Sequence, residues 1–323
     1  MPFFTTDDGV RLHYQTAGDG PAIVLIHGLT ASSLYFQKQI PVLARHCQVI
    51  APDLRGHGQS EASRDHLTLT RLAHDLKQLL DALHISKASF VGWSMGAQVI
   101  FEYIKNYSCQ SIEKIVIIEM TPKLMKSADW NCGLPGVFSR KPGDFGHEDN
   151  LYLLSVMLDN WEAYSRIVAQ RILNKSLYNE KMEFNAAADF KGKEDLPWLY
   201  EEAKKNRACI IAAFWISMAM QDYRPVLKNI EAPCLLAYGT ESNYYPPGNY
   251  EYMQKQIPDA RVAAFEGCGH ALHIQDPDVF NHTVMKFLEL PDSASGKGLT
   301  VAGEVRGRSF SIPKQNLSRH RKT

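Results

Sequence analysis

Apolar residues along the chain gather in short runs that alternate with longer stretches of helical periodicity. The short runs are rich in Val, Ile and Leu, which is typical of strands buried on both faces of a parallel sheet. The expected strands span residues 10–16, 23–27, 48–52, 89–92, 115–118, 234–238 and 261–265. The expected helices span residues 32–45, 69–83, 95–106, 250–257 and 277–288. This alternation predicts an α/β fold, in which a mostly parallel sheet is flanked by helices.

The alternation stops between residues 121 and 224. This region contains two long helical patterns, "HEDNLYLLSVMLDNWEAYSRIVAQRIL" and "WLYEEAKKNRACIIAAFWISMAM", and no good strand pattern. The strand pattern then returns at "CLLAYG". The simplest explanation is a helical insertion between two strands of one sheet. Since loops at the carboxyl ends of the strands carry the ligand site in such sheets, we expect the insertion to lie over that site as a lid.

The composition is that of an ordinary globular protein, with 323 residues of which 45% are hydrophobic and 22% are charged. The chain has no run of about 18 uncharged apolar residues and no basic start followed by a long apolar stretch, so neither a membrane span nor a signal peptide is expected. The six cysteines are scattered without C-x-x-C pairs. They are therefore expected to be reduced core residues rather than disulfides or a zinc site, which predicts a cytoplasmic protein.

The net charge of zero conceals a basic C-terminal tail. Residues 297–323 hold seven basic residues and one acidic residue, so the rest of the chain is mildly acidic. The tail is also rich in Gly and Ser and poor in large apolar residues, a composition typical of disorder. Two interpretations stay open, namely a solvated extension and a segment that contacts an anionic surface or a protein partner. The mildly acidic body gives no support to nucleic-acid binding.

A serine stands between two glycines in "SFVGWSMGAQVIFEY", after a strand pattern and before a helix pattern. A sharp turn from a buried strand into a helix strains one residue, and glycines at positions 92 and 96 remove the collisions around it. Gly-x-Ser-x-Gly in this context is a nucleophile elbow, which exposes the hydroxyl of Ser94 at the end of the sheet. The backbone N–H of Met95 then points to where a substrate oxyanion forms. The pattern alone also occurs by chance, as a surface turn with an incidental serine.

Two further motifs fit the same site. "VLIHGLT" ends a strand, and Gly28 lets the following backbone bring in the N–H of Leu29 as a second oxyanion donor. A plain strand-to-helix turn is the alternative. "FEGCGHALHIQDP" follows the last expected strand and presents His270 at the same sheet edge as Ser94. A serine followed by a histidine near the C-terminus is the order that this type of hydrolase requires.

These motifs, together with "DLRGHGQS" at residues 53–60, resemble the α/β-hydrolase superfamily over residues 8–290. The charged residues of the "DLRGHGQS" turn are expected to fix their loop rather than to catalyse. The resemblance implies an eight-stranded, mainly parallel sheet, a helical cap inserted between strands six and seven, a nucleophile–His–acid triad, and neither cofactor nor metal. It divides the chain into a core at 1–120 and 225–290, a cap at 121–224 and the tail at 291–323.

The triad acid is missing from the position where most members of the superfamily carry it. Three residues after Gly239, which ends the seventh strand, stands Ser242. Two substitutes are available: Glu119 ends the strand "KIVIIE", where some members carry their acid, and Glu241 stands one position early. A carboxylate directly after four apolar strand residues is partly buried and needs a partner such as an imidazole. We therefore favour Glu119, while Glu241 suits a solvated loop, and a triad without a working acid is the third alternative.

These assignments predict a carboxylic ester hydrolase that cleaves an ester, lactone or thioester of a small apolar substrate through an acyl-enzyme. Aromatic and Met residues of the insertion favour an apolar acyl or aromatic group, although each alone is more typical of packing: Trp130, Tyr164, Phe214, Trp215 and Met218. Trp93 and His273 are expected to be structural. Two other classes stay open, a cofactor-free oxygenase of the same fold and a non-catalytic ligand receptor with a degraded triad.

Overall fold

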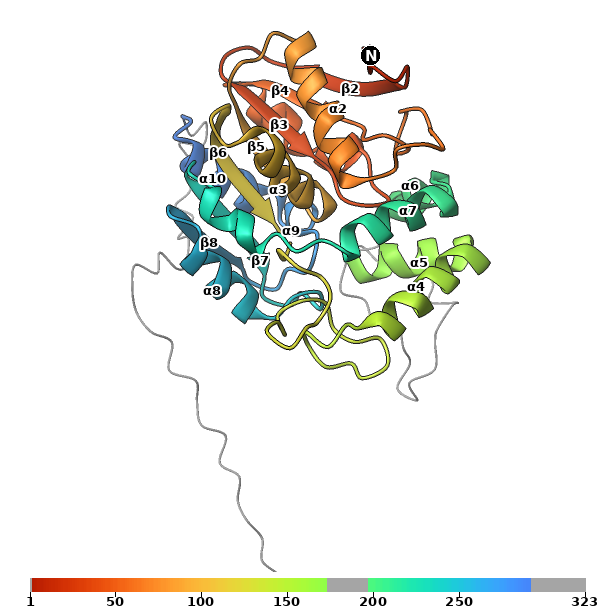
Figure 1. The fold of residues 1–323 in the computed structure, drawn as a ribbon. Coiled ribbons are helices and arrows are strands. Elements are labelled where there is room, and N and C mark those ends of the chain that lie inside the picture. Colours follow the sequence, from red (N-terminus) through yellow and green to blue (C-terminus); the bar gives the residue numbers. More distant parts are fainter. Residues whose placement is uncertain (1, 173–196, 292–323) are drawn as a thin grey trace, which may run out of the picture. The chain divides into compact units, whose positions relative to one another are not determined.

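The computed structural model of the protein describes residues 2–172 and 197–291. Within them, eight strands form one sheet in the order β1-β2-β4-β3-β5-β6-β7-β8 (Figure 1). Strand β2 pairs antiparallel with β1 and β4, and the remaining neighbours are parallel. The strands are β1 (Phe3–Thr5), β2 (Arg11–Ala17), β3 (Ala22–Ile26), β4 (Gln48–Pro52), β5 (Ala88–Trp93), β6 (Ile112–Ile118), β7 (Cys234–Gly239) and β8 (Ala260–Phe265). The α/β prediction is confirmed; β1 is too short for its pattern to be recognised.

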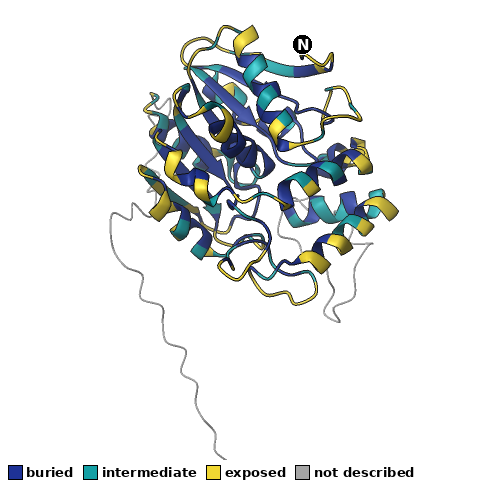
Figure 2. Cartoon of the chain, viewed as in Figure 1, coloured by how far each residue is buried: buried dark blue, intermediate teal, exposed yellow. Residues whose placement is uncertain are grey.

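Helices cover both faces of the sheet because the buried strand residues alternate between two hydrophobic clusters. Val24 and Ile26 of β3 pack with α2 (Leu69–Ala82), α3 (Met95–Tyr107) and α8 (Pro247–Gln256). Ile23 and Leu25 of the same strand pack with residues of α1 (Ile40–Leu43) and α10 (Pro277–Leu288) on the opposite face. Figure 2 shows the result, with buried strands in the centre and exposed residues on the outer sides of the helices. Such burial on both faces explains the continuous apolar runs of the central strands.

Among the described residues, four α-helices lie between β6 and β7, which confirms the predicted helical insertion. They are α4 (His147–Asp159), α5 (Trp161–Ile172), α6 (Pro197–Lys205) and α7 (Ala208–Ala219), and they form one group beside the sheet (Figure 1). The two long helical patterns are each broken at an asparagine. Asn160 ends α4 in a non-helical conformation, and its side-chain oxygen accepts a hydrogen bond of 3.0 Å from the N–H of Ala163 in the next helix. The break therefore follows from local capping, which apolar periodicity does not report.

The single helix expected over residues 32–45 is wrong. The structure instead has a 3-10 turn, η1 (Ser33–Phe36), followed by the short helix α1. Ser32 caps η1 by accepting a hydrogen bond from the N–H of Leu34, and Pro41 stands in the first turn of α1. Because proline has no N–H and clashes with the preceding turn, it is accommodated at the start of a helix and not in its interior. The chain therefore begins a new helix at this point.

The remaining elements are η2 (Arg224–Asn229), directly before β7, and α9 (Leu272–Gln275), directly before α10. No helix in the described part of the chain is long and apolar enough to cross a membrane. The division into core and cap stays a prediction, and all but the first residue of the tail predicted over 291–323 lies outside the described residues.

Candidate active site

Ser94 connects β5 to α3 in strained backbone geometry. Its φ is 52° and its ψ is −120°, values that a residue with a side chain rarely adopts. The neighbouring glycines are sterically required. A Cβ at Gly96 would lie 2.1 Å from the carbonyl oxygen of Ile26, and one at Gly92 would lie 2.7 Å from the backbone nitrogen of Ala97. The strand, the turn and the helix thus meet as the nucleophile-elbow interpretation expects.

Glu119 is the carboxylate that lies against His270. The residue follows β6 and is fully buried, and its Oε2 is 3.2 Å from Nδ1 of His270. Three other donors reach the carboxylate: the N–H of Gly239 at 2.9 Å, the hydroxyl of Ser242 at 2.6 Å and the hydroxyl of Tyr250 at 3.2 Å. Burial and the charge of Glu119 raise the pKa of Tyr250 well above its usual value, so its hydroxyl stays protonated and donates. These donors compensate the burial of the carboxylate.

The other candidate acid, Glu241, is exposed on the loop after β7. Its backbone N–H donates to the carbonyl of Cys268 at 3.0 Å, which ties this loop to the loop that precedes His270. Of the two alternatives weighed from the sequence, the structure brings Glu119 and the buried His270 together.

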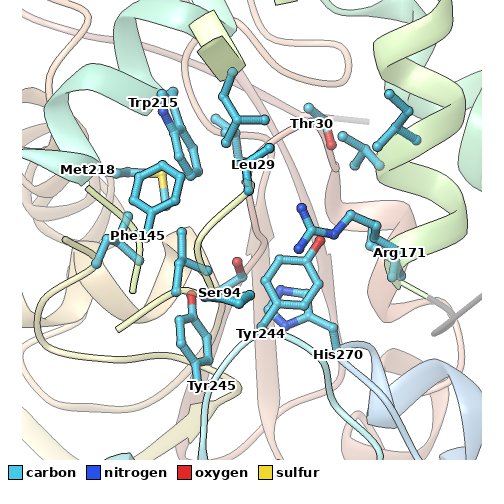
Figure 3. Close-up of a pocket in the computed structure, with 18 of the residues that line it drawn as sticks. Leu29, Thr30, Ser94, Phe145, Arg171, Trp215, Met218, Tyr244, Tyr245 and His270 are labelled. Carbon is cyan, nitrogen blue, oxygen red and sulfur yellow. The ribbon is translucent and has the colours of Figure 1, made fainter. Parts of the chain in front are cut away.

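Ser94 and His270 line the same pocket (Figure 3). In the described part of the chain no hydrogen bond joins the Ser94 hydroxyl to the imidazole, a bond that in many enzymes tightens only in the complex with substrate. The pocket is otherwise mainly apolar and aromatic. Its lining comprises Leu29, Thr30, Trp93, Ser94, Leu124, Leu134, Pro135, Val137, Phe145, Leu153, Tyr164, Ile167, Val168, Arg171, Ile172, Trp215, Met218, Tyr244, Tyr245 and His270.

The two expected oxyanion donors are the backbone N–H groups of Leu29 and Met95. Among the described residues, neither group donates a hydrogen bond to the protein. His27 fixes the Leu29 peptide, because its Nε2 accepts from the N–H of Leu54 at 2.9 Å and its Nδ1 donates to the carbonyl of Gly28 at 2.8 Å. Burial lowers the pKa of His27, consistent with a neutral ring that donates once and accepts once. Since C=O and N–H point in opposite directions across a trans peptide, this bond sets the direction of the Leu29 N–H.

Three of the five predicted lid residues line the pocket, and two do not. Tyr164, Trp215 and Met218 contribute to the lining. Trp130 instead donates its indole N–H to the carbonyl of Lys123 at 2.9 Å. Phe214 is buried, with its ring centre 5.6 Å from that of His57. Helical spacing therefore identified the aromatic character of the insertion but not which side chains face the cavity.

Asp53 and His273 occupy structural positions. Asp53 accepts hydrogen bonds from the backbone N–H groups of Ser33 at 2.7 Å and Gln59 at 2.9 Å, which holds the glycine-rich turn in place. His273 is fully buried, and neither of its ring nitrogens has a hydrogen-bond partner among the residues that the structure describes. Burial, with a smaller contribution from His270, lowers the pKa of His273 to about 3. The indole of Trp93 donates to the carbonyl of His270 at 2.8 Å, so this tryptophan supports the loop that carries the histidine.

No pattern in the sequence predicts two of the side chains that lie beside His270. The ring of Tyr244 is stacked on the imidazole with a centroid distance of 3.9 Å and an angle of 17°. The guanidinium of Arg171, near the end of α5, lies 5.0 Å from the centre of the Tyr244 ring. Figure 3 shows the three side chains together at one side of the pocket. They come from three separate segments, and no spacing in the sequence relates them.

Comparison with known proteins agrees with the fold described above. A family model described as the alpha/beta hydrolase fold matches residues 21–277. Pimeloyl-[acyl-carrier protein] methyl ester esterase of Nitrosomonas europaea is 25% identical over 279 residues, covering 83% of this chain and 96% of the relative. Non-heme chloroperoxidase CPO-A1 of Kitasatospora aureofaciens is 25% identical over 296 residues, covering 89% of this chain and 99% of the relative. An esterase from Exiguobacterium antarcticum has the same fold, with a TM-score of 0.75 at 19% identity, covering 89% of this chain and 98% of that one. Since the family model spans most of the chain, the protein belongs to the α/β-hydrolase fold family.

Proposed function

We propose that the protein is a serine hydrolase that cleaves a carboxylic ester-type bond (an ester, lactone or thioester) in a small substrate with an apolar body. One observation carries the proposal: Ser94, in its strained turn, and His270, held against the buried Glu119, line a single apolar pocket. A nucleophile, a base and an acid that orients the base are the parts that acyl transfer needs. The family includes esterases and a peroxidase among its members, so the family alone does not select the reaction.

In this mechanism Nε2 of His270 takes the proton of the Ser94 hydroxyl as its oxygen attacks the substrate carbonyl carbon. The carbonyl π electrons move to oxygen, and the N–H groups of Leu29 and Met95 stabilise the resulting oxyanion, each contributing on the order of 3 kcal/mol. The oxyanion collapses, the bond to the leaving group breaks, and the imidazolium protonates that group. Water, deprotonated by His270, then cleaves the acyl-enzyme and restores the Ser94 hydroxyl.

Glu119 has two roles in this proposal. By accepting the Nδ1 proton of His270 it selects the tautomer whose Nε2 is free to act as a base. It also stabilises the imidazolium that forms during the reaction. The hydrogen bonds from Gly239, Ser242 and Tyr250 hold the Glu119 carboxylate in place against Nδ1 of His270.

Labelling with a fluorophosphonate probe tests the proposal, because the probe reacts only with an activated serine. We expect the wild-type protein to label and Ser94→Ala to remain unlabelled. Ser108→Ala is a matched control, since Ser108 also has a positive φ of 65° but is exposed and does not line the pocket. The proposal fails if the wild type does not label, or if Ser94→Ala labels as strongly as the wild type.

A cytoplasmic location remains part of the proposal. It is supported by the cysteines, all six of which are free thiols, as expected in a reducing compartment.

A further inference from the structure

Arg171 is the only Lys, Arg, Asp or Glu among the residues that line the pocket in the described part of the chain. Apart from His270, the remaining lining is apolar, aromatic or neutral and polar. A guanidinium offers five N–H donors and is always charged. Arg171 is half-buried, and the part of its guanidinium that faces the apolar cavity is costly to desolvate unless an acceptor compensates it. The pocket therefore contains a charged hydrogen-bond donor, and the other described residues of its lining offer this donor no carboxylate.

The described residues supply no carboxylate to Arg171. Its guanidinium lies against the ring of Tyr244, and the distance from the guanidinium carbon to the ring centre is 5.0 Å. Another arginine of the same helix behaves differently: Arg166 lies 3.6 Å from the carboxylate of Glu162 and 4.6 Å from the centre of the Tyr200 ring. The contrast between two arginines on one helix indicates that the pocket-facing guanidinium keeps its hydrogen-bonding capacity for a group outside the described protein.

Arg171 lies close enough to His270 for one ligand to contact both Arg171 and the proposed catalytic residues. The ring of Tyr244 lies against both the guanidinium and the imidazole of His270, so the cation is one aromatic ring away from the reacting end of the pocket. The cavity between is lined by apolar side chains of the insertion and of the loop after β6. A ligand with an ester carbonyl at Ser94 and an anionic end at Arg171 would fill this space.

We propose that the natural substrate is an apolar ester that also carries a carboxylate, and that Arg171 binds this carboxylate. The inference rests on the ester hydrolase function proposed above and narrows its substrate class. A carboxylate accepts two parallel hydrogen bonds from a guanidinium, and such charge-assisted pairs are among the strongest in proteins. The anion supplies the missing acceptor, and the apolar lining holds the carbon chain that joins it to the scissile bond.

Matched substrate pairs test the inference. The mono-p-nitrophenyl ester of adipic acid and p-nitrophenyl hexanoate have acyl chains of equal length and differ in the terminal carboxylate; suberate and octanoate form a longer pair. In whichever pair the wild type hydrolyses faster, we expect kcat/KM to be about 10- to 100-fold higher for the ester with the carboxylate than for its neutral counterpart. This factor is the range of one charge-assisted hydrogen bond. In Arg171→Met this ratio should fall to 1 or below. Arg166→Met, on the same helix but outside the pocket lining, should keep the wild-type ratio.

The carboxylate is also tested on the alcohol side of the ester, by comparing 6-(butanoyloxy)hexanoate with hexyl butanoate. A preference for the acid in either series that Arg171→Met abolishes supports the inference. Equal rates for acid and neutral esters in both series, or a preference that survives in Arg171→Met, overturn it.

A binding measurement separates this inference from the proposed reaction. In Ser94→Ala protein, monomethyl adipate should raise the melting temperature more than methyl hexanoate at equal concentration, and the added Arg171→Met change should remove the difference. Binding of the acid without any hydrolysis by the wild type would leave the ligand class standing and refute the serine hydrolase proposal. Hydrolysis of neutral esters without preferential binding of the acid would support the serine hydrolase proposal and refute the carboxylate ligand.

Discussion

The hydroxyl of Ser242 donates a 2.6 Å hydrogen bond to Oε2 of Glu119, the same oxygen that faces Nδ1 of His270 at 3.2 Å. The residue at the position where most members of the superfamily carry the acid therefore contacts the carboxylate that we propose as the acid of this protein. Strands β6 and β7 are neighbours in the sheet, so side chains that follow either strand reach the same point. A carboxylate that follows either strand can therefore lie against the same histidine.

Replacing the buried acid should remove most of the activity. In Glu119→Gln the amide is a poor acceptor for the Nδ1 proton and does not stabilise the imidazolium, so we expect kcat for p-nitrophenyl esters to fall by about 10³- to 10⁴-fold. Glu241→Gln, on the exposed loop, should stay within about twofold of the wild type. Initial rates, with melting temperatures to verify folding, measure both effects. If Glu241→Gln lost activity while Glu119→Gln kept it, the acid that orients His270 would be Glu241.

A carboxylate at position 242 should rescue the loss of Glu119. In the double variant Glu119→Gln, Ser242→Asp, the new carboxylate starts from the side chain that already contacts the acid site, and we expect at least about tenfold more activity than in Glu119→Gln. Ser242→Asp alone places two carboxylates side by side, where one is driven to hold a proton, so it should be less active than the wild type. A double variant no more active than Glu119→Gln would show that position 242 cannot present an acid to His270.

The parts of the site that follow from backbone sterics were readable in the sequence. Gly92 and Gly96 are needed because a Cβ at either position would collide with backbone atoms. Since only glycine meets this requirement, the two positions can be recognised in the sequence. The position of Glu119 was readable for a related reason, since a carboxylate after an apolar strand has to have a partner. By contrast, Arg171 and Tyr244 meet at His270 through tertiary packing of separate segments. The break between α4 and α5 depends on the side-chain cap of Asn160, and hydrophobic periodicity does not report such a cap.

Adding one methyl group at the elbow should be severe, while the same change elsewhere should be harmless. A Cβ at Gly96 would approach the Ile26 carbonyl oxygen to 2.1 Å, so we expect Gly96→Ala to lower the free energy of unfolding by about 3 kcal/mol or more and to abolish labelling of Ser94. At Gly248, in the first turn of α8, the nearest atom would be 3.6 Å away. Gly248→Ala should be neutral or stabilising by up to about 1 kcal/mol. Urea unfolding compares the two, and normal stability of Gly96→Ala would contradict the steric argument.

Buried His273 should make the protein less stable in mild acid. Its pKa is lowered by burial to about 3, whereas the unfolded chain titrates near the ordinary value of 6.5. Between these two values the unfolded state binds a proton that the native state does not, so stability falls as the pH falls below 6.5. The contribution approaches about 1.4 kcal/mol per pH unit once the unfolded histidine is mostly protonated.

His273→Leu tests this contribution, because it removes the titrating group and two buried nitrogens without partners. We expect the variant to be more stable than the wild type at pH 7.5, with a difference that grows by about 1 kcal/mol or more between pH 6 and pH 5. Urea unfolding at these pH values gives the comparison. A difference that stays constant with pH would mean that His273 is not the neutral group described here.

Asn206, in the helical insertion, should support catalysis. Its side-chain amide donates to the carbonyl of Thr30 at 3.0 Å, and Thr30, with a φ of 65°, directly follows Leu29. Without this bond the strained turn is free to relax and to misdirect the Leu29 N–H, so we expect Asn206→Ala to lower kcat about tenfold with little change in KM.

Asn281→Ala is the matched control for that prediction. Asn281 is 6% exposed against 7% for Asn206, and its side-chain amide donates to the carbonyl of Lys38 at 3.0 Å. In the described part of the chain, the side-chain oxygen of each of the two asparagines has no hydrogen-bond partner. Both variants should lose about 1 to 2 kcal/mol of stability, but the control should retain the wild-type kcat because it touches no part of the pocket. Equal losses of kcat in the two variants would attribute the effect to stability. A loss confined to Asn206→Ala would show that the turn between α6 and α7 holds the Leu29–Thr30 turn in its working geometry.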